Sequence, residues 1–204
     1  KKRYGQWIIR DAGVVVNKID IKGLDIIRSN FPEAFRDYMK DFLMDILKNE
    51  PKDSIDKRYM DFKSNLASLP VTTIAQPTSV KNISKYTDKE GSRFNRALKG
   101  TPVHVKSALN YNDFLEHHKL DKKHESIANG SKIKWVYLRQ NPYGMQTMGF
   151  KGYDDPKDVM DYLAKYIDTD KMFKGALEKK VDMFYQAMKW SQPVDVTKTL
   201  DRFF

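Results

Sequence analysis

The sequence predicts an α+β fold that is mainly helical and contains two small antiparallel β-hairpins. Three observations support this prediction. Two pairs of β-rich runs are each joined by a short turn, several segments repeat apolar residues in the three- and four-residue steps of a helix, and prolines separate the segments. With 40% hydrophobic and 12% aromatic residues among 204, the chain can bury a core, so we expect a folded protein.

The first hairpin is predicted from the N-terminal sequence. Lys2–Arg10 and Val14–Ile21 are β-rich, and Asp11-Ala12-Gly13 between them supplies a turn residue that tolerates positive φ. Two antiparallel helices are expected next, over about residues 32–49 and 52–69, with Ser29 or Asn30 capping the first. Their aromatic stripes indicate a core rather than a ligand site.

The later elements follow the same patterns. In order, they are a strand at Val71–Ala75, a helix from Thr101-Pro102 to Leu115, a polar loop at His117–Asn129, a hairpin of Lys132–Arg139 and Met145–Phe150 around Asn141-Pro142-Tyr143-Gly144, a helix from Asp155-Pro156, and a last helix from about Asp170 to Trp190. The apolar stripe of the last helix is Phe173, Leu177, Val181, Phe184 and Met188.

The composition narrows the classes of function. The absence of Cys excludes a disulfide scaffold and thiolate metal sites, and it fits a reducing compartment. No apolar run approaches the ~20 residues of a membrane span, and no signal peptide is visible, so we expect no membrane partner. The chain begins at Lys1 rather than Met, and we expect it to be a piece of a longer protein.

Positive charge is concentrated in two segments. Of the net +10, Lys1–Arg28 carries +4 and Thr78–Arg139 carries +7, while the rest is near neutral. Within the second segment, Thr78–Lys106 has seven Lys or Arg residues against Asp88 and Glu90, interleaved with short polar side chains. Such a run is typical of binding to a polyanion, and we expect both segments to line one groove.

Several motifs occur in an order that resembles family B DNA polymerases. Lys1-Lys2-Arg3-Tyr4 and the later Lys22-Gly23…Arg28 are similar to the lysine–tyrosine strand and the lysine-glycine…arginine motif that close the palm domain. Further motifs resemble the thumb of replicative polymerases from T-even-like bacteriophages; they are Asn82-Ile83-Ser84-Lys85-Tyr86, Pro102-Val103-His104-Val105-Lys106, Tyr111-Asn112, Asn141-Pro142-Tyr143-Gly144 and the aromatic C-terminus. The resemblance covers essentially the whole chain, although Gly100 stands where a lysine is expected.

The resemblance implies a domain division and a role for each part. Residues 1–28 would be the last palm strands, 29–190 the thumb, and 191–204 a flexible tail of a DNA-directed DNA polymerase. Lys2, Arg3, Tyr4 and Arg28 would contact the minor groove of the primer–template duplex, where every base pair offers acceptors. The backbone of the duplex would be held by Thr78, Ser79, Asn82, Lys85, Lys99, His104 and Lys106.

The tail resembles a peptide that binds a sliding clamp. Thr197–Phe204 places Leu200 two residues before the pair Phe203 and Phe204, an apolar plug on a flexible segment. The alternative is a C-terminus that folds back onto its own core. The other implied partners are the upstream palm, fingers and exonuclease parts of the polymerase, and the implied location is the cytoplasm of an infected bacterial host.

No catalytic or metal-binding residue is predicted within this segment. Asp168-Thr169-Asp170 follows Tyr166-Ile167 and partly resembles the metal-binding hairpin of the family, but it lies after the lysine–tyrosine strand, and Thr169 and Asp170 suit helix caps. His117, His118 and His124 lack Cys or carboxylate partners in the pattern, which favours a solvated loop. The two Mg²⁺ ions of the full polymerase would be held upstream of Lys1.

Two other interpretations stay open. The chain could be a free-standing nucleic-acid-binding accessory subunit, for example one half of a split polymerase. It could also be an RNA-binding structural protein, which competition between duplex DNA and RNA would reveal.

Overall fold

A computed structural model describes residues 4–24, 26 and 28–193, and its α+β fold with two small antiparallel sheets confirms the predicted class. The chain forms two compact units. The helical unit comprises the chain up to Ser68 together with the part from Phe173 onward, and the sheet unit comprises Leu69–Met172. The division into palm strands, thumb and tail stays a prediction.

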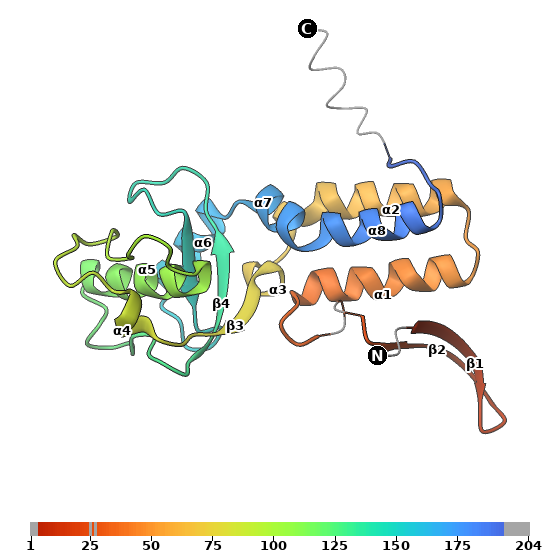
Figure 1. Cartoon of the computed structure of the whole chain (residues 1–204), viewed down its shortest axis with the longest axis horizontal. Helices are drawn as coiled ribbons and strands as arrows, with labels where there is room; N and C mark the ends of the chain where they lie inside the picture. Colours follow the sequence, from red (N-terminus) through yellow and green to blue (C-terminus); the bar gives the residue numbers. More distant parts are fainter. Residues whose placement is uncertain (1–3, 25, 27, 194–204) are drawn as a thin grey trace, which may run out of the picture. The chain divides into compact units, whose positions relative to one another are not determined.

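The helical unit begins with the predicted hairpin (Figure 1). Strand β1 (Tyr4–Asp11) pairs with β2 (Val14–Lys22) in antiparallel register. Ala12 and Gly13 between them have φ of 46° and 85°, so the turn uses the positive backbone angle that the glycine was expected to supply.

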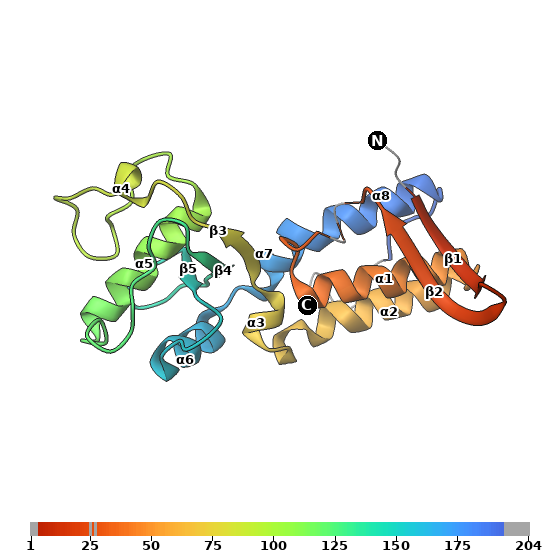
Figure 2. The ribbon, with the colours of Figure 1, turned by 90° about the horizontal axis from the view of Figure 1, so that it is seen from below.

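Three helices of this unit lie side by side (Figures 1 and 2). They are α1 (Glu33–Leu47), α2 (Lys52–Asn65), which is followed by the 3-10 turn η2 (Leu66–Ser68), and α8 (Lys179–Ala187). The ring of Phe35, early in α1, lies 6.1 Å from that of Phe62, late in α2. The two helices are therefore antiparallel, as predicted, and their aromatic stripes form the core.

The predicted last helix is built differently from the expectation. It consists of α7 (Thr169–Phe173), a π-helix η3 (Lys174–Glu178) and α8. A π-helical turn holds more residues than an α-helical turn, so it shifts the side chains that follow around the axis. Tyr185 is consequently fully buried while Met188 is 41% exposed, and the predicted stripe is wrong at its end.

The sheet unit is a three-stranded antiparallel sheet covered by helices. Its strands, in the order β3-β4-β5, are β3 (Gln76–Ser79), β4 (Lys132–Tyr137) and β5 (Thr147–Phe150). Its helices are α3 (Val71–Ile74), α4 (Ile83–Tyr86), α5 (Val103–His117) and α6 (Lys157–Tyr166), with α7 at its end. The second predicted hairpin is thus confirmed as β4 and β5, around a turn in which Gly144 has φ of 64°.

Helix α5 packs closely on β5. The buried Asn110 Nδ2 donates a hydrogen bond to the Thr147 carbonyl over 2.7 Å. A Cβ at Gly149 would lie 3.2 Å from the Ser107 carbonyl oxygen. The absence of a side chain at Gly149 therefore permits the close approach of the helix.

Prolines precede several of the helices. Pro32, Pro51, Pro70, Pro102 and Pro156 each immediately precede a helix, with ψ between 136° and 143°. The predicted caps Ser29 and Asn30 are wrong because Pro32 occupies the N-cap position of α1, and no described side chain caps that helix. At α5, Pro102 rather than Thr101 holds this position. Val71–Ala75 is likewise not a strand: residues 71–74 form α3 after Pro70, and the β-branched run misled the prediction.

Within the described residues, no helix is both long enough and apolar enough to cross a membrane.

Candidate nucleic-acid interface

The cationic segment Thr78–Lys106 starts on the free edge of the sheet. Thr78 and Ser79 belong to β3, where they pair with Ile133 and Lys132 of β4. Because β3 is one of the two edge strands, one row of its backbone groups has no neighbouring strand in this sheet. Polar side chains therefore occur beside backbone donors at this edge.

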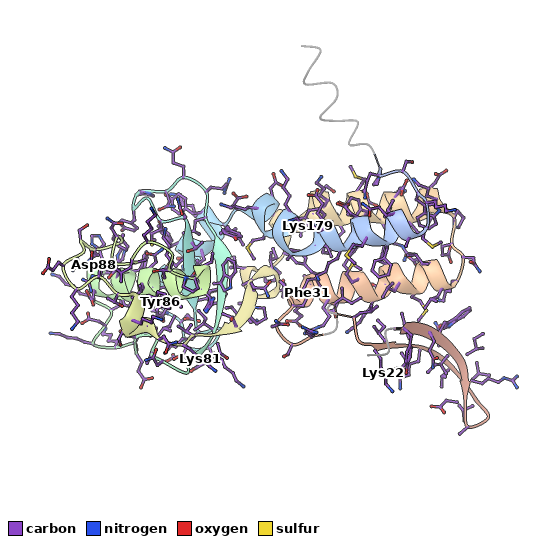
Figure 3. All side chains as sticks on the ribbon, viewed as in Figure 1. Lys22, Phe31, Lys81, Tyr86, Asp88 and Lys179 are labelled. Carbon is purple, nitrogen blue, oxygen red and sulfur yellow. The ribbon has the colours of Figure 1, made fainter. Side chains whose placement is uncertain are left out.

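A single helical turn, α4, follows this edge. Asn82 precedes it with φ of 59°, and the Ile83 amide donates to Asn129 Oδ1 over 2.8 Å. The Lys85 ammonium lies 5.6 Å from the centroid of the Tyr86 ring, and the lysine side chain is exposed. Figure 3 labels Lys81, which precedes this turn, and Tyr86, which is its last residue.

The chain then returns to α4 before it enters α5. The Leu98 amide donates to the Tyr86 carbonyl over 3.0 Å, and Thr87 forms a β-bridge with Ala97. These pairings bring the backbone at Leu98, and with it the neighbouring Lys99, back beside the end of α4. Sequence separation alone gave no indication of this approach.

His104 and Lys106 lie in the first two turns of α5. The Pro102 carbonyl accepts from the amides of Val105 and Lys106, and no side chain of the described residues caps the helix. The first amides of the helix therefore lack acceptors within it, an arrangement that favours an anion. The Lys106 ammonium donates to the neutral Gln146 Oε1 over 3.2 Å and forms no ion pair with any residue that the structure describes.

Several lysines of the segment carry charge without an acidic neighbour. Among the residues that the structure describes, Lys81, Lys85 and Lys99 are exposed and take part in no ion pair. Their charge is directed to solvent. This is the property that contact with an external polyanion requires.

The middle of the segment forms contacts within the protein rather than facing solvent. Arg96 forms ion pairs with Asp113 over 3.2 Å and with Glu116 over 3.0 Å. The Phe94 amide donates to Asp113 over 2.6 Å. Burial raises the pKa of Asp113, while the Phe94 amide and the Arg96 guanidinium oppose that rise. The positive charge of Arg96 is therefore largely neutralised by ion pairs within the protein.

The acidic residues that hold the middle of the segment lie far along α5 from the cationic start of this helix. Nine residues separate His104 from Asp113, about 14 Å at 1.5 Å per residue. The two ends of the segment, which contain the predicted contacts, are thus separated from its middle. Arg93 and Arg96 were not among the predicted contacts, and the ion pairs of Arg96 give a physical reason for leaving it out.

The first hairpin places two further polar residues beside Tyr4. Tyr4 pairs across the ladder with Lys22, whose ammonium lies 5.9 Å from the ring centroid. The Tyr4 hydroxyl donates to Asp20 over 3.2 Å. Lys22 was not among the predicted contacts, although the strand register, set by the short turn, could have indicated it. Figure 3 labels Lys22 at the open end of the hairpin.

The remaining predicted contacts are only partly visible. Lys2, Arg3, Leu200, Phe203 and Phe204 lie outside the described residues. Arg28 is exposed and takes part in an interaction within the chain.

Asp168-Thr169-Asp170 forms a helix boundary, as predicted, but the cap differs. The Lys171 amide donates to Asp168 Oδ1 over 2.9 Å, so Asp168 rather than Thr169 or Asp170 caps α7. Over the described ranges, no group of three or more His, Asp or Glu side chains is arranged to hold a metal ion.

His117 and His118 are exposed, as expected, but they lie at the end of α5 rather than in a loop. His117 is the last residue of α5, and the ring of His118 lies 4.2 Å from that of Phe114. Only His124 lies in the loop, with Nδ1 3.2 Å from the Asp154 carbonyl oxygen. The first two belong to an aromatic cluster around Tyr143.

Comparison with known proteins agrees with the resemblance that the motifs indicated. No protein-family model matches the chain. The DNA-directed DNA polymerase of Enterobacteria phage T4 is 24% identical over 183 residues, which are 88% of this chain and 19% of that polymerase. This similarity confirms the predicted resemblance. The chain therefore spans about a fifth of the length of its relative.

A solved structure of the family B DNA polymerase from the hyperthermophilic archaeon Pyrobaculum calidifontis was also matched. It is 16% identical, with a TM-score of 0.47 over 87% of this chain and 19% of that polymerase.

Proposed function

Since this chain resembles a segment of a phage family B DNA polymerase, we propose that it holds the primer–template duplex within a longer polymerase. The parent protein would catalyse DNA-directed DNA synthesis. The carboxylates that hold its two Mg²⁺ ions would lie outside this segment.

One observation carries the proposal. Among the described residues, the outer parts of Thr78–Lys106 combine exposed lysines, which form no ion pair, with the start of α5, which no side chain caps. Lysine ammonium groups and helix N-terminal amides both bind phosphate oxygens without reading sequence. Thr78, Ser79, Asn82, Lys85, Lys99, His104 and Lys106 would supply these contacts.

The first hairpin would supply the second contact. Tyr4 and its cross-strand neighbour Lys22, together with Lys2, Arg3 and Arg28, would face the minor groove. Purine N3 and pyrimidine O2 accept hydrogen bonds there in every base pair, so a cation can test pairing geometry without selecting a sequence.

The salt dependence of duplex binding tests the proposal. Each lost phosphate contact reduces the slope of log K against log salt by about 0.9. Lys85→Ala combined with Lys106→Ala should therefore reduce the slope by about 1.8 in fluorescence-anisotropy titrations of a labelled primer–template.

A matched control removes the same charge elsewhere. Lys57 and Lys179 are exposed and lie outside the ion pairs of the described chain, and Lys57→Ala with Lys179→Ala should leave the slope nearly unchanged. An unchanged slope in the Lys85/Lys106 variant, or an equal loss in the control, would contradict the proposal. Equal affinity for duplex RNA would instead favour an RNA-binding protein.

We also propose that the tail docks the polymerase on its sliding clamp through Leu200, Phe203 and Phe204. This part rests on the sequence alone. Deleting Leu200–Phe204 from the full polymerase should abolish clamp-stimulated synthesis and spare synthesis without the clamp. Clamp stimulation that survives the deletion would refute this docking.

A further inference from the structure

The sheet unit contains a groove whose walls are mainly aromatic and acidic. It has a volume of about 310 Å³ and is formed by the end of α5, the 141–144 turn and α6. The side chains that matter here are His118, Tyr143, Asp158, Asp161, Tyr162 and Tyr166. None of them belongs to the proposed duplex contacts.

The rings of the groove form a fixed stack. The Tyr143 and Tyr162 ring centroids are 5.6 Å apart, and those of Tyr162 and Tyr166 are 4.7 Å apart. Tyr162 donates its hydroxyl proton to Asn141 Oδ1 over 2.7 Å, and His118 Nε2 lies 3.0 Å from the Tyr143 hydroxyl. These hydrogen bonds orient the rings before any ligand arrives.

The acidic side chains lie on the same face of α6 as two of the rings. Asp158 and Tyr162 are four residues apart, as are Tyr162 and Tyr166, so the three share one helix face. Asp161 is paired with Lys157. Asp158 is exposed and takes part in no ion pair with any described residue, so one carboxylate is available.

A cation already lies beside one of these rings. The Lys165 ammonium is 5.3 Å from the Tyr166 ring centroid, which is within cation–π range. Tyr162, next to it in the stack, has no such partner among the described residues. The free Asp158 carboxylate and the Tyr162 ring therefore both suit a second cation.

We propose that this groove binds an arginine side chain presented by a partner polypeptide. A guanidinium group is planar, so it stacks on a tyrosine ring while it donates two parallel hydrogen bonds to one carboxylate. Lys157 pairs with Asp161, and Lys165 also lines the groove, so the selection comes from Asp158: a phosphate placed against Asp158 and Tyr162 would be repelled by this carboxylate, whereas a guanidinium would be bound. The groove would therefore serve a protein partner and not the duplex.

An NMR titration of the complete chain with acetyl-Gly-Arg-Gly-amide tests this proposal, and the tyrosine ring resonances report the binding. The expected result is a saturable shift of the Tyr162 ring resonance. This resonance is assigned by its loss in Tyr162→Phe. Asp158→Asn should weaken the binding about two- to fivefold, as for an exposed charge pair. Asp121→Asn, which removes a charge from an exposed loop residue outside the groove, should leave it unchanged.

Two further probes separate the alternatives. Acetyl-Gly-citrulline-Gly-amide has the same shape without the charge and should produce no saturable shift. An equal response to this peptide, or no response to the arginine peptide, would overturn the proposal. A saturable shift with hexathymidylate would overturn it in favour of nucleic acid. Duplex binding measured on the same variants reports on the proposed function separately.

Discussion

Replacing Gly149 with alanine tests whether close packing of α5 on β5 holds the cationic helix in place. The new Cβ would lie 3.2 Å from the Ser107 carbonyl oxygen, 3.3 Å from the Ser107 carbonyl carbon and 3.2 Å from Ile133 Cδ1. Two of these three atoms belong to the backbone of α5. They cannot rotate away as a side chain can, so the helix must move by a few tenths of an ångström.

The expected cost follows from two opposing effects. Overpacking a buried site costs about 1–3 kcal/mol. Alanine restricts the unfolded chain more than glycine does, which returns about 0.4–1 kcal/mol. From the central values of these two effects, the free energy of unfolding should fall by about 1.3 kcal/mol in Gly149→Ala.

Urea denaturation followed by tryptophan fluorescence measures this change. Trp135 lies directly opposite Gly149 on β4, and it is the tryptophan of the sheet unit, so a background of Trp7→Phe and Trp190→Phe isolates its signal. Gly5→Ala is the control, because no atom of the described residues lies within 4 Å of a Cβ at that position. A Gly149→Ala variant as stable as the parent, or more stable, would refute the packing argument.

Three further predictions concern charged groups. Asp113→Ala should lower the unfolding free energy by about 1–3 kcal/mol, because a buried carboxylate that accepts from Phe94 is lost; hydrogen exchange at the Phe94 amide should quicken. Burial and the neighbouring imidazole lower the pKa of His118 below 6.5. The unfolded chain therefore binds more protons near pH 6, stability should fall between about pH 7 and pH 5, and His118→Gln should reduce that fall. Burial raises the pKa of Asp45 while Arg58 opposes the rise, so Arg58→Met should raise it further in a carboxyl NMR titration.

Each of these has a result that counts against it. Unchanged exchange at Phe94 in the Asp113 variant would mean that the amide does not depend on this carboxylate. An identical pH dependence with and without His118 would assign the acid sensitivity to other groups. A lower pKa of Asp45 after Arg58→Met would contradict the ion pair.

Local patterns were enough to predict most of the elements. The Asp11-Ala12-Gly13 turn, the apolar stripes of α1 and α2 and the second hairpin depend on short-range preferences that single segments express by themselves. Helix starts were harder to predict. Ser29, Asn30 and Thr101 are good caps by residue type. Pro32 and Pro102 nevertheless occupy the N-cap positions of α1 and α5, because the proline ring already fixes a suitable φ.

The candidate site shows the same division. The charge of Thr78–Lys106 and the motifs at its ends are visible in the sequence, and they led to the resemblance that comparison confirmed. The sequence could not show that Arg96 is neutralised by Asp113 and Glu116, because those residues are 17 and 20 positions away along the chain. The aromatic groove was missed for the same reason, since its rings come from three separate segments.

The sequence by itself determined the fold class, the hairpins, the concentration of positive charge and the relationship to a polymerase segment. Each depends on composition, short-range periodicity or the order of motifs. The tertiary structure alone decided which cations are available and which are paired, that Lys99 returns beside α4, and that Lys22 lies opposite Tyr4. The physical reason is that ion pairing and ring stacking depend on distances of a few ångströms between residues distant in the chain, and only the packed backbone sets those distances.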